Sequence, residues 1–191
     1  MATNSNLPDK INKTEFLEIY SPLNFSMSLS KNDIKNSYDA IKGNFTSLAK
    51  IRKDHGAETL FDFVTIWLVK LNEYVFGRSE KQMTDYQISE TTMLIIDTYY
   101  YLNIAEVAII FKKIKSGSYG KIFGELNGVF IMESFSQYFK ERQTAQIKIE
   151  AEKRKIQRAE NFDNTDDYVP MPESIKSKIL SMENRILLFK S

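Results

Sequence analysis

The sequence predicts an all-α fold in which four main helices form an orthogonal or bundle-like array. Three observations predict it. Apolar residues recur at three- and four-residue spacing, capping residues open several of these segments, and lysines or glycines close them. At 191 residues the chain suits one domain with tails. We expect a flexible arm or extended segment over residues 1–29, a helical domain over 30–160, and an acidic linker with a short terminal helix over 161–191.

The composition excludes several functional classes. The chain has no cysteine, which excludes disulfides, thiolate metal sites and cysteine nucleophiles. Its formal net charge is +1, so any nucleic-acid contact must come from a local patch. The first residues lack the apolar stretch of a signal peptide, and no apolar run approaches the ~20 residues that span a bilayer. We therefore expect a cytoplasmic protein without a membrane partner.

The N-terminal part of the predicted arm contains two contrasting patterns. Residues 14–20 place Phe16, Leu17 and Tyr20 on one side of a helical turn that Pro22 is expected to end. Residues 23–29 then alternate apolar and polar, which is the period of a strand. One isolated strand has no pairing partner in the sequence. We therefore interpret 23–29 as an extended segment that lies across the helices.

Two helices are predicted between residues 30 and 77. Ser30 with Asp33 resembles a capping box, and the helix that it opens is expected to end before Gly56. The second helix, over 57–76, is the most apolar segment and ends at Gly77. Because apolar residues nearly encircle this second helix, we expect it to lie centrally. The apolar positions of the first helix are Ile34, Tyr38, Ile41, Phe45, Leu48 and Ile51.

Two further capping boxes predict a helical hairpin. Thr84 with Gln87 opens a helix that runs to about residue 101, and Asn103 with Glu106 opens the next one. That second helix ends in three lysines and a glycine. A long helix is predicted over 127–158, apolar in its first half and charged almost all round in its second. Residues 172–189 are expected to form a short amphipathic helix.

The sequence contains no recognisable catalytic or metal-binding constellation. The one histidine, His55, stands beside a glycine at a predicted helix end, where a capping or surface role is the usual one. No cluster of histidines and carboxylates has metal-ligand spacing, and no serine lies in a G-x-S-x-G elbow. We therefore predict no enzymatic activity, no catalytic residue, no metal site and no cofactor.

Four of the seven glycines fall between residues 116 and 128, at Gly117, Gly120, Gly124 and Gly128. The first two flank a G-S-Y-G-K run whose spacing is too short for a phosphate loop. Two interpretations remain. In one, the run is a tight turn, with the last three glycines on one helical face so that another helix can approach. In the other, Gly120, Lys121 and the next helix N-terminus hold an anion.

The second half of the long helix is basic. Residues 140–160 carry seven lysines and arginines against four glutamates. Such a stripe can contact phosphates, and the candidate residues are Lys148, Lys153, Arg154 and Arg158. The alternative is a solvated or oligomerising helix supported by ion pairs such as Glu150 with Arg154.

A resemblance covers residues 84–142, about a third of the chain. It rests on Met83-Thr84-Asp85-Tyr86-Gln87-Ile88, Phe111-Lys112-Lys113, Gly117-Ser118-Tyr119-Gly120-Lys121, Leu126-Asn127-Gly128 and Tyr138-Phe139-Lys140-Glu141-Arg142. The pattern resembles a poorly characterised helical family of phages and mobile elements of gut bacteria. That family is similar in outline to small phage proteins that load or regulate a replicative helicase. It often has Asp before the last glycine of the pattern, where this chain has Asn127.

The resemblance implies a non-enzymatic accessory protein of DNA replication that binds a protein partner, the replicative helicase, with DNA as a weaker candidate ligand. The implied docking residues are Tyr119, Lys121, Glu125, Asn127 and Arg142. The alternative is a structural virion component (a ring, connector or packaged protein) that works as an oligomer through self-assembly.

Overall fold

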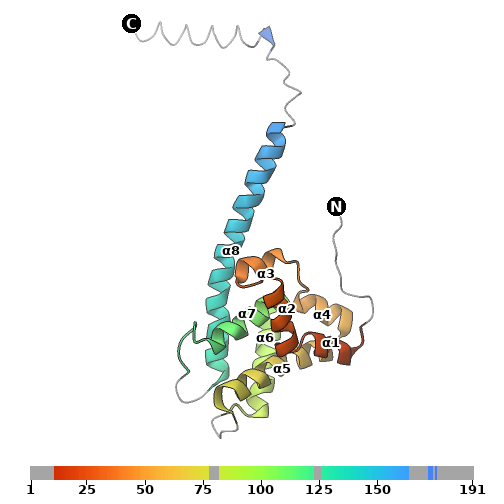
Figure 1. Ribbon diagram of the computed structural model, residues 1–191, viewed down its shortest axis with the longest axis vertical. Coiled ribbons are helices and arrows are strands. Elements are labelled where there is room, and N and C mark those ends of the chain that lie inside the picture. The colour runs from red at the N-terminus through yellow and green to blue at the C-terminus, as the bar shows by residue number, and fades with distance from the viewer. Residues whose placement is uncertain (1–10, 78–81, 123–125, 164–171, 174, 176–191) are drawn as a thin grey trace. The chain divides into compact units, whose positions relative to one another are not determined.

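The computed structural model describes residues 11–77, 82–122, 126–163, 172, 173 and 175 (Figure 1). Within these residues, helices joined by turns and loops make up the fold. The eight helices within them are α1 (Lys13–Ile19), α2 (Pro22–Lys31), α3 (Ser37–Lys42), α4 (Leu48–His55), α5 (Ala57–Phe76), α6 (Asp85–Tyr99), α7 (Ile104–Lys115) and α8 (Gly128–Asp163). The all-α prediction is therefore confirmed. The orthogonal or bundle-like arrangement of four main helices stays a prediction.

The chain divides into two compact units, Met1–Glu150 and Ala151–Ser191. All the buried apolar side chains described belong to the first unit. The predicted boundaries at residues 30 and 161 are not tested by this division. Within the described residues, no helix has the length and apolarity needed to cross a membrane.

The predicted extended segment at 23–29 is wrong, because α2 spans it. Pro22 occupies the first turn of α2, where its missing N–H would have had no helical partner in any case. Phe25 and Leu29 lie one turn apart and are buried, whereas Leu23 and Met27 are exposed. The alternation therefore came from a helix that buries every fourth residue. The predicted helical turn before Pro22 corresponds to α1.

The single helix predicted from Ser30 is wrong as well, because turns interrupt the helical backbone twice in this segment. Ser30 lies inside α2, and Asp33 and Asn44 both have positive φ, at 59° and 51°. Two short helices replace the long one. Asn36 forms a capping box at the start of α3, and the side chain of Ser47 caps α4. The apolar periodicity continued across both breaks, so it did not reveal them.

Helix α5 lies centrally, as predicted from its apolar circumference. It packs against α1, α2, α4, α6 and α7. Its Trp67 ring is 2% exposed, and the indole Nε1–H donates to the backbone carbonyl of Tyr20 at 3.1 Å. Asn72, also on α5, is buried and bonds both backbone groups of Met83 just before α6. The central helix therefore fixes the start of α6 as well as the core.

Both predicted capping boxes of the hairpin are confirmed. Thr84 with Gln87 opens α6, and Asn103 with Glu106 opens α7. Asn103 also donates its Nδ2–H to the carbonyl of Ala40 at 3.1 Å, which ties α7 to α3. The long helix α8 begins at Gly128 and ends at Asp163, five residues later than predicted. Most of the predicted terminal helix, 172–189, lies outside the described residues.

Candidate partner-binding surfaces

The turn after α7 is a Schellman motif that the glycine pattern anticipated. Gly117 has φ +72° and donates to the carbonyl of Ile114 at 3.0 Å, while Ser118 donates to that of Lys113 at 2.9 Å. Gly120 has φ +117°, a conformation that L-residues rarely adopt. The first two glycines therefore shape the turn through their backbone conformation.

The expected helical face of Gly120, Gly124 and Gly128 is wrong at its first position. Gly120 lies in the turn before α8, and Gly124 lies outside the described residues. Gly128, at the start of α8, does permit a close approach. A Cβ there would come within 2.6 Å of the Thr91 hydroxyl oxygen on α6. The close contact between helices therefore rests on one glycine.

Tyr119 is buried at 8% exposure, although it was predicted to dock a partner. The Lys113 ammonium lies 5.7 Å from the centre of its ring, and Lys113 pairs with Glu141. Among the described residues no group makes a hydrogen bond of good geometry with the Tyr119 hydroxyl. Burial raises the pKa of that hydroxyl, and the charge of Glu141 raises it further. Tyr119 is therefore part of the packing between α7 and α8.

Arg142 is also engaged inside the protein, through Glu106. The Glu106 carboxylate is 1% exposed, and its Oε1 accepts from Arg142 Nε at 2.8 Å and from the Tyr138 hydroxyl at 3.2 Å. Its Oε2 accepts from the backbone N–H of Asn103 at 2.9 Å. A buried carboxylate is tolerated when it is paired and fully hydrogen-bonded, and Glu106 meets both conditions. It joins the start of α7 to the middle of α8.

The remaining predicted docking residues lie near the start of α8. Asn127 is exposed, and its Oδ1 accepts from the backbone N–H of Phe130 at 2.9 Å, so it acts as a helix cap. Lys121 is exposed, and Glu125 lies outside the described residues. The sequence motif therefore mainly builds the junction between α7 and α8.

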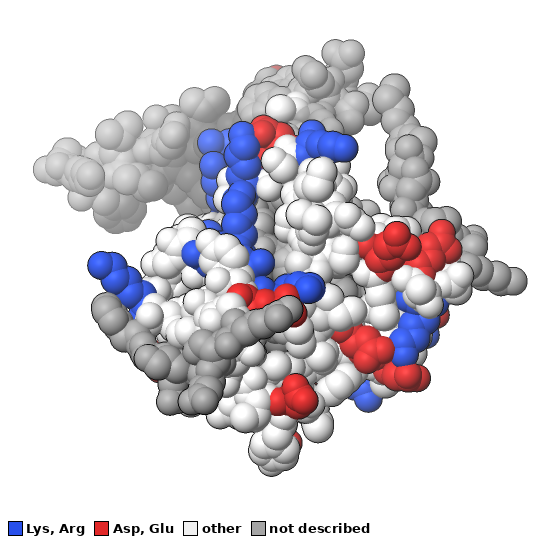
Figure 2. Space-filling view, turned by 60° about the horizontal axis from the view of Figure 1, so that its bottom comes forward, with Lys and Arg blue, Asp and Glu red and all other residues white. Residues whose placement is uncertain are grey.

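The four predicted nucleic-acid contacts, Lys148, Lys153, Arg154 and Arg158, are all exposed on α8. The ammonium of Lys148 lies 4.8 Å from the ring centre of Tyr38 on α3, whose other cationic neighbour is Lys42 at 4.9 Å. Figure 2 shows Lys and Arg side chains gathered in a column on one face, whereas Asp and Glu side chains stand in separate groups. The stripe remains a candidate for phosphate contacts.

A second surface, on α6, was missed by the sequence interpretation. Its exposed residues recur at a spacing of four and three, which keeps them on one helical face: Tyr86, Glu90, Met93, Asp97 and Tyr100. We call these five residues the α6 face. Tyr86 is 73% exposed and Tyr100 is 57% exposed. Its signal in the sequence is the recurrence of Tyr86, Met93 and Tyr100 at intervals of seven residues, or two helical turns.

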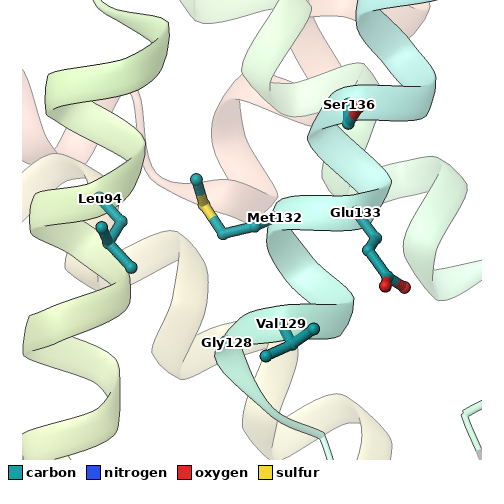
Figure 3. A pocket seen from close by; sticks show the side chains of 6 residues that line it. All are labelled: Leu94, Gly128, Val129, Met132, Glu133 and Ser136. Atoms are coloured by element: carbon teal, nitrogen blue, oxygen red, sulfur yellow. The ribbon is translucent and has the colours of Figure 1, made fainter.

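A shallow apolar groove of about 380 Å³ lies beside this face, between α6 and α8. Figure 3 shows Met132 reaching from α8 toward α6, where Leu94 lies. The groove is lined by Leu94, Gly128, Val129, Met132, Glu133 and Ser136.

The α6 face is acidic as well as apolar. The sequence from 82 to 111 contains Asp85, Glu90, Asp97 and Glu106 and neither lysine nor arginine. Glu106 is buried, whereas the other three are exposed. An acidic surface with apolar anchors is complementary to a basic partner surface. No group of three or more metal-ligating side chains is found among the described residues.

In the part of the chain that the structure describes, these features define a helical protein with an acidic, partly apolar face on α6 and a basic stripe on α8. The model of DUF6633, a family of unknown function, matches residues 82–185, which is more than half of the chain. The chain belongs to this family. The match includes the α6 face, the basic stripe of α8, and Glu106 with its partners on α8, which we call the Glu106 junction. No curated protein and no solved structure matches the chain.

Proposed function

We propose that this protein is a non-enzymatic accessory protein that acts by binding another protein through the α6 face. The observation that carries the proposal is the exposure of three large side chains, Tyr86, Met93 and Tyr100, at helical spacing on one face. Contiguous exposed apolar surface is costly in water and is typical of interaction sites, where aromatic residues contribute most to affinity. The acidic residues between the anchors favour a partner rich in lysine and arginine.

The buried polar groups support binding over chemistry, because their hydrogen bonds hold helices together. Asn72 fixes the start of α6, Asn103 caps α7 and reaches α3, and Glu106 joins α7 to α8. Each is engaged in the packing of secondary structure. The α6 face and the four basic residues of α8 predicted to contact nucleic acid are exposed and take no part in these buried contacts.

The resemblance to phage proteins supports a more specific proposal. In it, the protein is a cytoplasmic accessory of DNA replication encoded by a phage or mobile element, and it binds a replicative helicase in the manner of a helicase loader. The alternative is a structural virion component that works as an oligomer. The α6 face favours the first proposal because it offers a compact site for a different, basic partner.

The test is size-exclusion chromatography with light scattering, applied to the purified protein alone and with the replicative helicase of its source. We expect a defined complex with wild-type protein. We expect the complex to be lost when Met93→Asp and Tyr100→Asp are combined, because two anchors then become charged. A matched control is Leu23→Asp on α2, since Leu23 is 71% exposed and lies outside the α6 face.

Three results would count against the proposal. Equal binding of the helicase by the α6 variant and by wild-type protein would show that the α6 face is not the binding site. No complex with any replicative helicase would remove the replication role. A large closed assembly formed by the protein alone would favour the structural alternative.

A further inference from the structure

A regular line of exposed residues runs along α8 over its first five turns, and three of them also line the groove between α6 and α8. Their positions are separated by four, three, four, three and four residues, the spacing that keeps side chains along one seam of a coiled coil. The six residues are Val129, Glu133, Ser136, Lys140, Gln143 and Ile147, and all are exposed. We call this line the α8 seam. It shares no residue with the α6 face. Its intervals are the same in both chain directions, so two antiparallel copies can align position by position.

The two ends of the seam are its apolar residues. Val129 and Ile147 are each 69% exposed, and they lie 18 residues apart, about 27 Å along the helix axis. Since both stand on one straight helix, they cannot cover one another within a single chain. An antiparallel second copy of α8 brings Ile147 of that copy against Val129, beside the groove that Leu94 and Met132 line.

The charges of the seam select the antiparallel direction. A parallel pair would place Glu133 against its own equivalent and Lys140 against its own equivalent. In the antiparallel pair, the Glu133 carboxylate faces Gln143 of the second copy and lies within one turn of its Lys140. Sliding the pair until Lys140 faces Lys140 would restore repulsion and separate the apolar ends. One direction and one register therefore join the apolar ends and keep opposite charges closer than like ones, since Lys140 lies three positions from Glu133 of the second copy and four from its Lys140.

We infer that two copies of this chain associate through antiparallel pairing of their α8 seams, with Val129 of each copy against Ile147 of the other. The symmetry makes every contact occur twice, as in other two-fold dimers. Ser136 faces Lys140 near the two-fold axis, where a small side chain leaves room for the lysine stem. This inference goes beyond the proposed function, because it concerns the association of the chain with itself.

Site-specific cross-linking tests the register directly, since the natural chain has no cysteine. Val129→Cys and Ile147→Cys are made as separate proteins and oxidised alone and mixed. We expect a disulfide-linked dimer in the mixture and monomers in each single preparation, because a disulfide needs Cα atoms within about 7 Å. An equal yield when Ser118→Cys, an exposed site off the seam, replaces Val129→Cys would show random collision and overturn the inference.

Charge reversal tests the direction. By light scattering over a range of concentrations, we expect Glu133→Lys and Lys140→Glu each to raise the dimer dissociation constant by ~10-fold or more. The double variant should dimerise like wild type, because the reciprocal pairs are restored with exchanged signs. Monomeric wild-type protein at all concentrations, or cross-linking of Val129→Cys alone, would overturn the inference. Neither result bears on helicase binding, which is tested with α6 variants.

Discussion

At the scale of single residues, two buried tyrosines of the α7–α8 junction differ in how their hydroxyls are satisfied. The Tyr138 hydroxyl donates to the buried Glu106 carboxylate, whereas the Tyr119 hydroxyl lies near Glu141 without a hydrogen bond of good geometry. Removing a buried polar group is costly when it leaves a partner unsatisfied and nearly neutral when it does not. The two tyrosines therefore form a matched pair for mutation to phenylalanine.

We expect Tyr138→Phe to lower the free energy of unfolding by about 1 kcal/mol, because Glu106 loses one of its hydrogen bonds. Tyr119→Phe should lower that free energy by less, since the Tyr119 hydroxyl makes no hydrogen bond of good geometry. Urea denaturation at neutral pH measures both. A larger loss for Tyr119→Phe than for Tyr138→Phe would contradict the assignment.

The same pair predicts an alkaline sensitivity. Burial is the main cause that raises the pKa of both hydroxyls, and nearby Glu141 and Glu106 add to it. The folded state therefore retains its tyrosine protons above pH 10, near the pKa of an unfolded tyrosine. The contribution of these two hydroxyls to the free energy of unfolding is therefore constant below about pH 10 and falls as the pH rises further. Either phenylalanine variant should show a shallower fall than wild type.

At the scale of elements, α8 can approach α6 because its first residue has no side chain. The Thr91 hydroxyl that would meet a Cβ at Gly128 donates to the carbonyl of Gln87 at 2.7 Å, so it is held in place. A helical alanine is otherwise preferred to glycine by up to about 1 kcal/mol. The close contact with Thr91 therefore requires glycine at position 128, where helix propensity alone would favour alanine.

We expect Gly128→Ala to lower the free energy of unfolding by about 1–3 kcal/mol through this overlap. Adding Thr91→Ala should recover much of the loss, because it removes the hydroxyl oxygen. Gly117→Ala is the control. Gly117→Ala should also lower the free energy of unfolding, because Gly117 has a positive φ, and Thr91→Ala should not recover that loss. Strictly additive effects of Gly128→Ala and Thr91→Ala would contradict the close contact.

Local signals predicted some elements well and others poorly. The boxes at Thr84 and Asn103 were reliable, because a cap and its reciprocal partner lie within four residues of each other. The segment around Leu23 was misassigned because a short amphipathic helix and a strand can share an apolar alternation over seven residues. The breaks at Asp33 and Asn44 depend on positive φ in residues other than glycine, for which the sequence carries no strong signal.

The candidate surfaces were harder to predict than the helices. Tyr119 and Arg142 looked available for docking because a motif does not reveal which of its members are buried. Tyr119 lies beside the ion pair of Lys113 with Glu141, and Arg142 pairs with Glu106; these pairs join residues 28 and 36 positions apart. Met93 is the reverse case, because it is an apolar residue that the structure leaves 48% exposed. Exposure on a helix with several apolar faces is decided by which neighbours cover it.

At the scale of the whole molecule, a net charge of +1 conceals a separation of charge along the chain. Residues 82–111 carry only acidic charges, whereas residues 140–158 are rich in lysine and arginine. The separation allows one protein to present a face for a basic partner and a stripe for an acidic one.

We expect Lys153→Ala, Arg154→Ala and Arg158→Ala, combined in one variant, to lower any DNA affinity and to reduce its dependence on salt. Fewer counterions are released when fewer phosphates are contacted. Fluorescence anisotropy at several salt concentrations measures the slope. A triple variant with Lys13, Lys31 and Lys70 changed to alanine is the control, since it removes equal charge elsewhere. An unchanged slope in the α8 variant would exclude DNA as a ligand of the stripe.

The Glu106 junction has a consequence for how members of the family diverge. One carboxylate accepts hydrogen bonds from the side chains of Tyr138 and Arg142, so a change at any one of these three positions leaves the others poorly matched. Substitutions there should be inherited as sets. In an alignment of DUF6633 sequences, we expect an apolar residue at position 106 to occur with an uncharged residue at position 142, and the glutamate to occur with arginine or lysine.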